Sequence, residues 1–293
     1  MATSGAVSGE LTGSGYGLIE GPVWVPGRGL MYSDVLLGGV YCLSETGEVS
    51  DVFAHRKGIG GMSLHVDGGL VVSGRNIGYK AFNGGDTITL LERDEAQGLV
   101  GFNDITTDGD GRVYAGGLGS SPVFEDGREP AAENLYLIDL DGSSRVVGED
   151  VRLTNGLGFS PDGKTLYHSD SLRRAVCCYS VEADGSLGPK ETFVVTEKGV
   201  PDGLVVSEDG AVWVALAGGG KGVAVYDPDG GLREHIEIPH PMCTSVCFGG
   251  DDLKDLYIVS GSEGLDGDRA GGIFKVRTAV AGLPVAPARV ALG

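Results

Sequence analysis

The sequence predicts an all-β fold, a six-bladed β-propeller. Three observations lead to this prediction. A unit of short apolar strands and tight turns recurs six times along the 293 residues. The 53 glycines are spread evenly through the chain, which is typical of many tight turns and not of low-complexity disorder. No segment shows sustained 3.6-residue apolar periodicity, so we expect almost no helix.

The repeat is clearest when it is aligned on the apolar or aromatic pair that opens the strand after each turn. The pairs recur at intervals of roughly 45 residues, the length of one propeller blade. They are Met31-Tyr32, Val71-Val72, Val113-Tyr114, Leu166-Tyr167, Val212-Trp213 and Leu256-Tyr257. In residues 154–170, two apolar runs flank Pro161-Asp162-Gly163. Asp-Gly between apolar runs predicts a hairpin, because glycine accepts the positive φ that the turn requires.

Further apolar runs follow each pair, for example residues 222–226 and 235–238, and complete four short strands per unit. We see no linker that divides the chain. Residues 1–14 are small and polar and are expected to form a flexible lead-in, and residues 15–293 a single propeller domain. Either residues 288–292 or the segment before Glu20 is expected to close the ring as the outer strand of the last blade.

Charge and cysteine content exclude several classes of protein. A net charge of −19 argues against nucleic acid or an anionic membrane as partner, because both require a basic face. No apolar run approaches the ~20 residues of a membrane span. The five cysteines are odd in number and contain no Cys-x-x-Cys, which favours reduced thiols. The N-terminus lacks the features of a signal peptide, so we expect a cytoplasmic protein. The sequence does not define an oligomeric state.

A polar residue stands where the inner strand begins in four of the six units. These residues are Glu20, Asn103, Asn155 and Asp202, and the other two units have Gly60 or Gly61 and Thr244 or Ser245. Equivalent positions on successive inner strands of a propeller point at one axis, so the four side chains are expected to meet at one end of the channel. Carboxylate and amide oxygens favour Ca²⁺, then Mg²⁺ or Mn²⁺. Zn²⁺ prefers nitrogen and sulfur ligands but remains possible.

Each of these motifs taken alone has a simpler interpretation. Pro201-Asp202-Gly203 is usually a turn, and Asn155-Gly156 a turn or bulge; their occurrence in register across blades is what favours a metal site. The run Asp108-Gly109-Asp110-Gly111 lacks the glutamate that an EF-hand needs at its twelfth position, which here is Gly119, and is predicted to be a hairpin turn. The five histidines show no metal-binding spacing, and no Gly-x-Ser-x-Gly motif occurs.

Several motifs together resemble the senescence-marker-protein-30/gluconolactonase family (SMP-30/gluconolactonase/LRE-like). They lie at residues 20–24, 102–104, 154–163, 201–203, 244–250 and 271–274, in the same order as in the family. The resemblance implies a six-bladed propeller with one divalent cation in the channel. It also implies metal ligands at Glu20, Asn155 and Asp202, and a residue at Asn103 that contacts substrate and often a metal-bound water. Lactone hydrolysis is the typical activity, and relatives hydrolyse organophosphates.

The sequence departs from the family at two positions that bind sugar hydroxyls. Members that act on sugar-acid lactones usually carry an arginine two places before the asparagine that matches Asn103, where this chain has Gly101. They also tend to have a glutamate just after the next strand, where this chain has residues 117–121, Gly-Leu-Gly-Ser-Ser. Arg75 is a candidate to compensate as a substrate-binding residue. Gluconolactone itself is therefore in question as the substrate.

The sequence-based hypothesis is a lactonase that opens a small lactone ring with a metal-bound water. Asp202 is the candidate base, and Asn103 orients substrate or water. One alternative is a different reaction at the same metal, such as organophosphate hydrolysis or a non-hydrolytic step on a natural product. A second is a non-catalytic propeller that binds a partner and uses the ion structurally.

Overall fold

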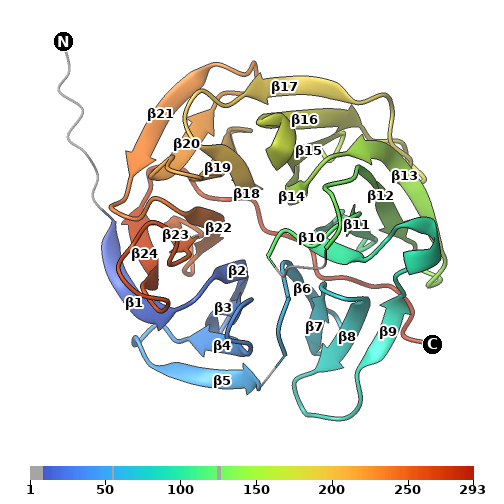
Figure 1. The fold of residues 1–293 in the computed structure, drawn as a ribbon, viewed down its shortest axis with the longest axis horizontal. Coiled ribbons are helices and arrows are strands. Elements are labelled where there is room, and N and C mark those ends of the chain that lie inside the picture. The colour runs from blue at the N-terminus through green and yellow to red at the C-terminus, as the bar shows by residue number, and fades with distance from the viewer. Residues whose placement is uncertain (1–8, 55, 124–126) are drawn as a thin grey trace.

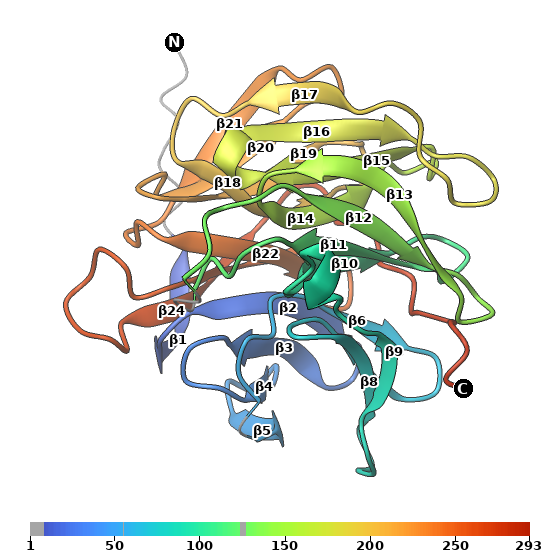
Figure 2. The same cartoon turned by 45° about the vertical axis from the view of Figure 1, so that its right-hand side comes forward.

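The chain forms a closed ring of six four-stranded antiparallel sheets around a central channel (Figures 1 and 2). The structure is a computed structural model and describes residues 9–54, 56–123 and 127–293. This confirms the predicted all-β six-bladed propeller. Within these ranges the helical residues are limited to two 3-10 turns, η1 (Glu95–Gln97) and η2 (Ser171–Arg173), and no helix has the length and hydropathy of a membrane span.

Each blade is a meander that runs outward from the channel. The first three blades comprise β2 (Ile19–Val25), β3 (Gly29–Asp34), β4 (Val40–Leu43) and β5 (Val49–Phe53); β6 (Met62–His65), β7 (Gly69–Val72), β8 (Ile77–Ala81) and β9 (Ile88–Leu91); and β10 (Gly101–Thr107), β11 (Val113–Leu118), β12 (Glu133–Ile138) and β13 (Ser144–Val151).

The last three blades follow the same order. They comprise β14 (Thr154–Phe159), β15 (Thr165–Asp170), β16 (Ala175–Ser180) and β17 (Glu191–Val195); β18 (Val200–Val206), β19 (Val212–Ala217), β20 (Gly222–Tyr226) and β21 (Leu232–Glu237); and β22 (Cys243–Gly249), β23 (Asp255–Ser260), β24 (Gly271–Arg277) and β1 (Glu10–Tyr16). The apolar pairs used to align the repeat all lie on the second strand of a blade.

The N-terminal strand closes the ring. β1 pairs antiparallel with β24, from Glu10 opposite Lys275 to Tyr16 opposite Gly271. Of the two closures that the sequence allowed, the structure has the one that uses the segment before Glu20. The expected lead-in over residues 1–14 therefore needs correction, because residues 10–14 belong to β1; residues 1–8 lie outside the described part. The small polar residues of β1 concealed it, since the strand is held by backbone pairing and carries no apolar alternation.

The C-terminal segment after β24 crosses the face of the ring opposite the site described below (Figure 1). Its amides donate to the blades that it passes: Leu283 N–H to Val206 O at 2.9 Å, Ala288 N–H to Leu64 O at 2.7 Å and Ala291 N–H to Leu140 O at 2.9 Å. Ala288 is fully buried. The segment thus ties several blades together and supplies no outer strand.

Apolar side chains fill the spaces between neighbouring blades. Val212 and Val214 on β19 are fully buried, as are Leu256 and Ile258 on β23 and the rings of Tyr32 and Tyr114. Burial of one such aliphatic side chain contributes about 1.5–3 kcal/mol. Because every blade packs on two neighbours, the inner strands are held in fixed positions around the channel.

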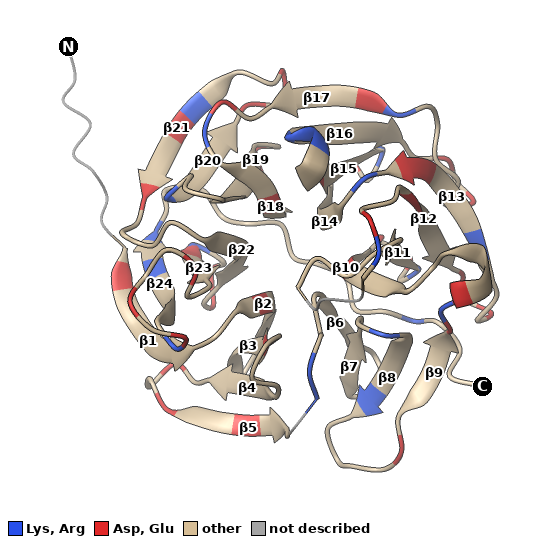
Figure 3. Cartoon of the chain, viewed as in Figure 1, with Lys and Arg blue, Asp and Glu red and all other residues tan. Residues whose placement is uncertain are grey.

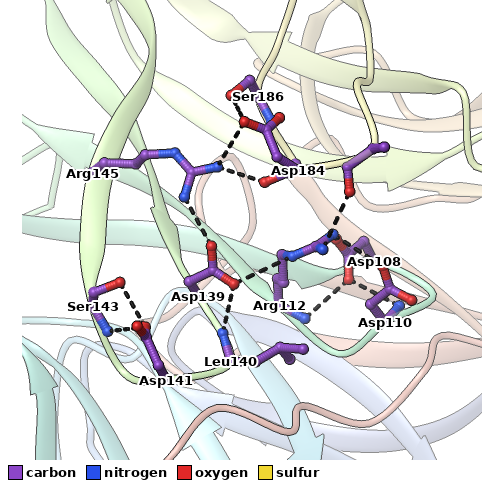
Figure 4. Close-up of polar contacts among 12 residues, drawn as sticks. Asp108, Asp110, Arg112, Asp139, Leu140, Asp141, Ser143, Arg145, Asp184 and Ser186 are labelled. Atoms are coloured by element: carbon purple, nitrogen blue, oxygen red, sulfur yellow. Dashed lines mark hydrogen bonds and ion pairs between the residues drawn. The ribbon is translucent and has the colours of Figure 1, made fainter.

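Ion pairs join the third and fourth blades at the face opposite the site (Figure 4). Asp108 accepts from the backbone N–H of Asp110 at 3.0 Å and from Arg112 Nη1 at 3.0 Å. Arg145 donates to Asp139 at 2.9 Å and reaches Asp184 of the next blade. The Asp108–Gly111 run is therefore a hairpin turn, as predicted, whose acids are satisfied by amides and arginines.

Candidate active site

The inner strands share a β-bulge at one end of the channel. In β2, β10, β14 and β18 the pairing with the second strand of the blade places two residues of the inner strand opposite one residue of its partner, for example Asn155 and Gly156 between Thr154 and Leu157 on β14. A bulge leaves residues unpaired and re-aims their side chains. These four bulges determine which side chains point into the mouth of the channel.

Three of the predicted residues occupy the same place in their bulges. Asn103, Asn155 and Asp202 each directly follow the last paired residue before the bulge, whereas Glu20 is itself that paired residue, opposite Ser33. Glu20 thus lies one position earlier than the sequence alignment implied. The reason is the turn, because hairpins of different length precede the aligned pairs and counting back from them misses the register by one residue. All four side chains nevertheless line the same cavity.

That cavity has a volume of about 530 Å³ and opens at the mouth of the channel. Its floor is formed by Glu20, Asn103, Asn155 and Asp202. Arg75, the predicted substrate-binding residue, also contributes to its lining, as does Gly101. The structure therefore brings together every residue that the sequence analysis assigned to the site.

Close packing of the inner strands requires glycine next to these residues. A Cβ on Gly203 would lie 2.7 Å from Ser245 Cα of the neighbouring blade, a backbone atom that cannot rotate away. Real Cβ atoms do not approach other atoms this closely. Gly203 therefore allows β18 to approach β22, which places Asp202 close to the axis.

A chain of hydrogen bonds fixes the two asparagines. Asn103 Nδ2 donates to Asn155 Oδ1 at 2.6 Å and to Thr154 O at 2.8 Å. Asn155 Nδ2 donates to Ser171 Oγ at 2.7 Å, and Ser171 Oγ in turn donates to Pro201 O at 2.7 Å. Since the Asn155 amide nitrogen is engaged by Ser171, its oxygen must face the site, where its second lone pair is available to a further partner.

The site gathers the carboxyl groups of Glu20, Asp104 and Asp202, and none of the three forms an ion pair with a residue that the structure describes. Burial raises the pKa of Glu20 well above its ordinary value, and the Asp202 and Asp104 carboxylates raise it further. Burial and the Asp104 carboxylate likewise raise the pKa of Asp202. Burial raises the pKa of Asp104 to about 7, against a hydrogen bond from Ile105 N–H. Asp202 Oδ1 is buried and has no hydrogen-bond partner.

These residues fit a hard divalent cation. An unpartnered buried carboxylate oxygen is costly unless a donor or cation meets it, and Asp202, whose Oδ1 is such an atom, lines the cavity together with Glu20 and Asn155. All donors there are oxygens, the set that Ca²⁺, Mg²⁺ and Mn²⁺ prefer. Among the described residues, no three acidic, imidazole or thiol side chains gather as a metal-binding cluster. A cation at this floor thus depends on the amide oxygen of Asn155 in addition to two carboxylates.

Sequence reasoning missed two polar residues of the site. Ser171 follows β15 at the start of η2, and its only sequence signal is the Ser169-Asp170-Ser171 run at the end of a strand. Asp104 directly follows Asn103 within the bulge of β10 and lines a second cavity on the opposite side of the floor. The sequence shows that Asp104 follows Asn103, but the side of the bulge on which Asp104 lies depends on the strand register.

The fold and the site together define a six-bladed propeller with an oxygen-donor site at one mouth of its channel. A family model described as "SMP-30/Gluconolactonase/LRE-like region" matches residues 18–262, and the chain belongs to this family. Pentonolactonase XacC of Haloferax volcanii is 30% identical over 94% of this chain and 95% of its own. A 6-deoxy-6-sulfogluconolactonase of Pseudomonas putida is 31% identical over 90% of this chain and 92% of its own.

A solved structure agrees with the fold. A calcium-binding protein, regucalcin, from Agrobacterium tumefaciens superposes with a TM-score of 0.82 at 24% identity, covering 97% of this chain and 98% of its own. This likeness concerns the propeller fold.

Proposed function

We propose that this protein is a divalent-metal-dependent lactonase that opens a small lactone ring to a hydroxy acid. The observation that carries the proposal is the unpartnered Asp202 Oδ1 at the floor of a 530 Å³ cavity, beside Glu20 and Asn155. Two relatives are named as lactonases, the pentonolactonase at 30% identity and the 6-deoxy-6-sulfogluconolactonase at 31% identity. Glu20, Asn155 and Asp202 would hold the cation, with Ca²⁺ the best match to their oxygens.

The reaction adds water across an ester bond. A divalent cation supplies Lewis-acid polarisation of the ester carbonyl and makes a nearby water a better nucleophile. Water oxygen bonds to the carbonyl carbon, the ring C–O bond breaks, and the water's proton passes through Asp202 to the departing alkoxide. Asp202 suits this role because its Oδ1 is free of any hydrogen bond. In the products the ring has opened to one hydroxyl group and one carboxylic acid, which ionises to a carboxylate and releases a proton to solvent.

The other residues position the reactants. Asn103 lies beside Asn155 on the cavity floor, and its amide can orient the substrate carbonyl or the attacking water. Ser171 holds the Asn155 amide in the orientation that presents its oxygen. Apolar side chains on one wall, including Leu153, Val200 and Met242, limit the access of bulk water.

The same cavity also supports a second candidate, hydrolysis of a less polar ester such as an organophosphate. Gly101 favours it, because a Cβ there would lie 2.9 Å from Gly74 O, so the chain has no room for a polar clamp at that position.

A pH-stat assay on a panel of lactones and one organophosphate separates these functions. Rates are measured before and after chelation and with Ca²⁺, Mg²⁺, Mn²⁺ or Zn²⁺ restored. The proposal predicts lactone turnover that chelation removes and one ion returns. Turnover of the organophosphate alone favours the second candidate. Metal-dependent melting without turnover on any ester assigns the ion a structural role.

A further inference from the structure

The charged side chains of the cavity are unevenly distributed around its lining. Four cationic side chains line it, and each comes from a different connection: Lys57 between β5 and β6, Arg75 between β7 and β8, Arg93 between β9 and β10, and Arg128 between β11 and β12. Above the oxygen floor, Glu263 is the single acid of the lining that the structure describes. The opposite wall is apolar. In Figure 3 the basic segment between β5 and β6 lies beside the central opening.

This cationic flank contrasts with the rest of the molecule. The chain has 22 Lys and Arg against 41 Asp and Glu, so a random patch of its surface is acidic. A field of that sign repels anions from the channel, and four clustered cations at the mouth reverse it locally. This cluster of cations is therefore expected to attract an anionic ligand.

Neighbouring acids pair with only part of the flank. Glu95 contacts Arg93 at 2.6 Å and Arg128 at 2.9 Å, and Arg128, Arg93 and, least of the three, Arg75 lower the pKa of this exposed carboxyl group. Arg75 and Lys57 make no ion pair or hydrogen bond with any residue that the structure describes. Both side chains are exposed to the cavity mouth. They are therefore available to a ligand.

The backbone holds Arg75 beside the catalytic floor. Gly74 and Phe102 form an antiparallel bridge in which Phe102 N–H donates to Gly74 O at 2.7 Å and Gly74 N–H donates to Phe102 O at 3.2 Å. Phe102 directly precedes Asn103. The bridge needs Gly101, since any side chain there would press on Gly74 O at 2.9 Å. The connection is also tied to the Arg93 loop, because Asn76 Oδ1 accepts from Arg93 N–H at 3.1 Å.

We propose that the natural substrate is a lactone that carries an additional anionic group, a carboxylate, phosphate or sulfonate, and that Arg75 and Lys57 bind this group. The inference rests on the proposed lactonase function and names its substrate class. A planar guanidinium matches the oxygens of such groups, and charge-assisted hydrogen bonds of this kind are worth about tenfold in affinity or more. The cations also offset the repulsion between the substrate's charge and the acidic floor.

The test compares matched pairs of lactones that differ by one anionic group. One pair is 5-oxotetrahydrofuran-2-carboxylate and its uncharged carboxamide; the other is 6-phosphogluconolactone and gluconolactone. The first pair reports on a carboxylate and the second on a phosphate. Wild type is expected to prefer the charged member of at least one pair by about tenfold or more in kcat/KM. Arg75→Gln should remove most of this preference by raising KM for the charged member, and the loss on the uncharged member should be smaller.

The control variant is Arg152→Gln. Arg152 is an exposed arginine next to the cavity residue Leu153 but is not part of the lining, so it makes the same change in net charge near the same mouth. It should leave both members of each pair unchanged. Equal rates on charged and uncharged lactones in wild type, or equal losses for both in Arg75→Gln, overturn the inference while leaving the lactonase proposal intact.

A binding measurement covers the case in which no lactone is hydrolysed. Calorimetry of Ca²⁺-saturated protein compares gluconate with 6-phosphogluconate. Tighter binding of 6-phosphogluconate that Arg75→Gln abolishes and Arg152→Gln preserves supports the anion site even if turnover fails. Equal binding of the two acids, or binding of neither, together with no turnover, rejects both proposals.

Discussion

Asp202 is the residue on which the proposed chemistry depends most directly. It is the one floor residue whose buried oxygen lacks any hydrogen-bond partner, and it serves both as a cation ligand and as the proton acceptor. Asp202→Asn keeps the shape but removes the charge and the basicity. We expect the lactone hydrolysis rate at saturating cation to fall by about 10²–10⁴-fold. Asp209→Asn, which alters an acid paired with Arg233 away from the site, should have no effect. An unchanged rate in Asp202→Asn contradicts the assignment.

Ser171 acts through Asn155, and its effect is expected on metal affinity. Ser171→Ala removes the acceptor that holds the Asn155 amide at 2.7 Å, so the amide oxygen is no longer held toward the floor. Loss of such an orienting partner usually weakens metal affinity by about 10–100-fold. The measurement is Ca²⁺ calorimetry on chelated protein. Ser169→Ala is a matched control, because Ser169 Oγ is buried on the same blade without any hydrogen-bond partner. Equal affinities in the two variants would show that Ser171 does not position Asn155.

At the scale of elements, the bulges and the close approach of inner strands form the site. Gly203→Ala is expected to destabilise the fold by about 1–3 kcal/mol, because the new Cβ meets Ser245 Cα at 2.7 Å and β18 must move away from β22. The shift should also displace Asp202 and weaken cation binding. Urea unfolding and calorimetry measure the two effects. Gly109→Ala, with open space around its Cβ and no positive φ, should be nearly neutral; similar stabilities of both variants would refute the packing argument.

His168 links the second strand of the fourth blade to its inner strand and gives the fold a specific pH dependence. Its Nε2 lies 2.6 Å from Thr154 Oγ1, and burial lowers the pKa of its imidazole to about 4. The unfolded chain binds this proton near pH 6.5, so the unfolded state holds more protons between these values. The free energy of unfolding should therefore fall with pH from about 6.5 to about 4, by up to about 1.4 kcal/mol per pH unit.

His168→Gln tests this dependence. Urea unfolding of cation-saturated protein at a series of pH values should show a shallower loss of stability below pH 6.5 in the variant than in wild type. Above that pH the two curves should run parallel, because the histidine is neutral in both states. Identical slopes across the whole range would mean that the imidazole titrates normally in the fold.

The sequence predicted elements better than it predicted registers. Turn glycines and apolar pairs were enough to locate the second strand of every blade, because hairpin chemistry is local. The position of Glu20 was missed by one residue, since pairing across a bulge depends on the partner strand. The segment that contains β1 was predicted only as one of two possible closing strands, because a strand of small polar residues is defined by the edge it pairs with. Ser171 and Asp104 were missed because their roles arise from contacts between segments that only the folded chain brings together.

At the scale of the whole molecule, a cation at the mouth of the channel would connect separate blades of the ring. Glu20 belongs to the first blade, Asn155 to the fourth and Asp202 to the fifth, so an ion held by these residues joins both sides of the channel. It also offsets the burial and the carboxylate repulsion that raise the pKa values of Glu20 and Asp202. Cation binding is thus expected to stabilise the complete ring as well as to support catalysis.

The most direct test is a calorimetric titration of chelated protein with Ca²⁺, followed by thermal unfolding of the same samples. We predict one cation per chain in wild type and a rise in unfolding free energy of about 2.7 kcal/mol at a hundredfold excess over Kd. Glu20→Gln and Asp202→Asn should bind Ca²⁺ much more weakly and lose the stabilisation at the same Ca²⁺ concentration, whereas Asp209→Asn should keep both. If wild type binds no divalent cation, or if both site variants bind Ca²⁺ as tightly as wild type, then Glu20 and Asp202 do not hold a cation.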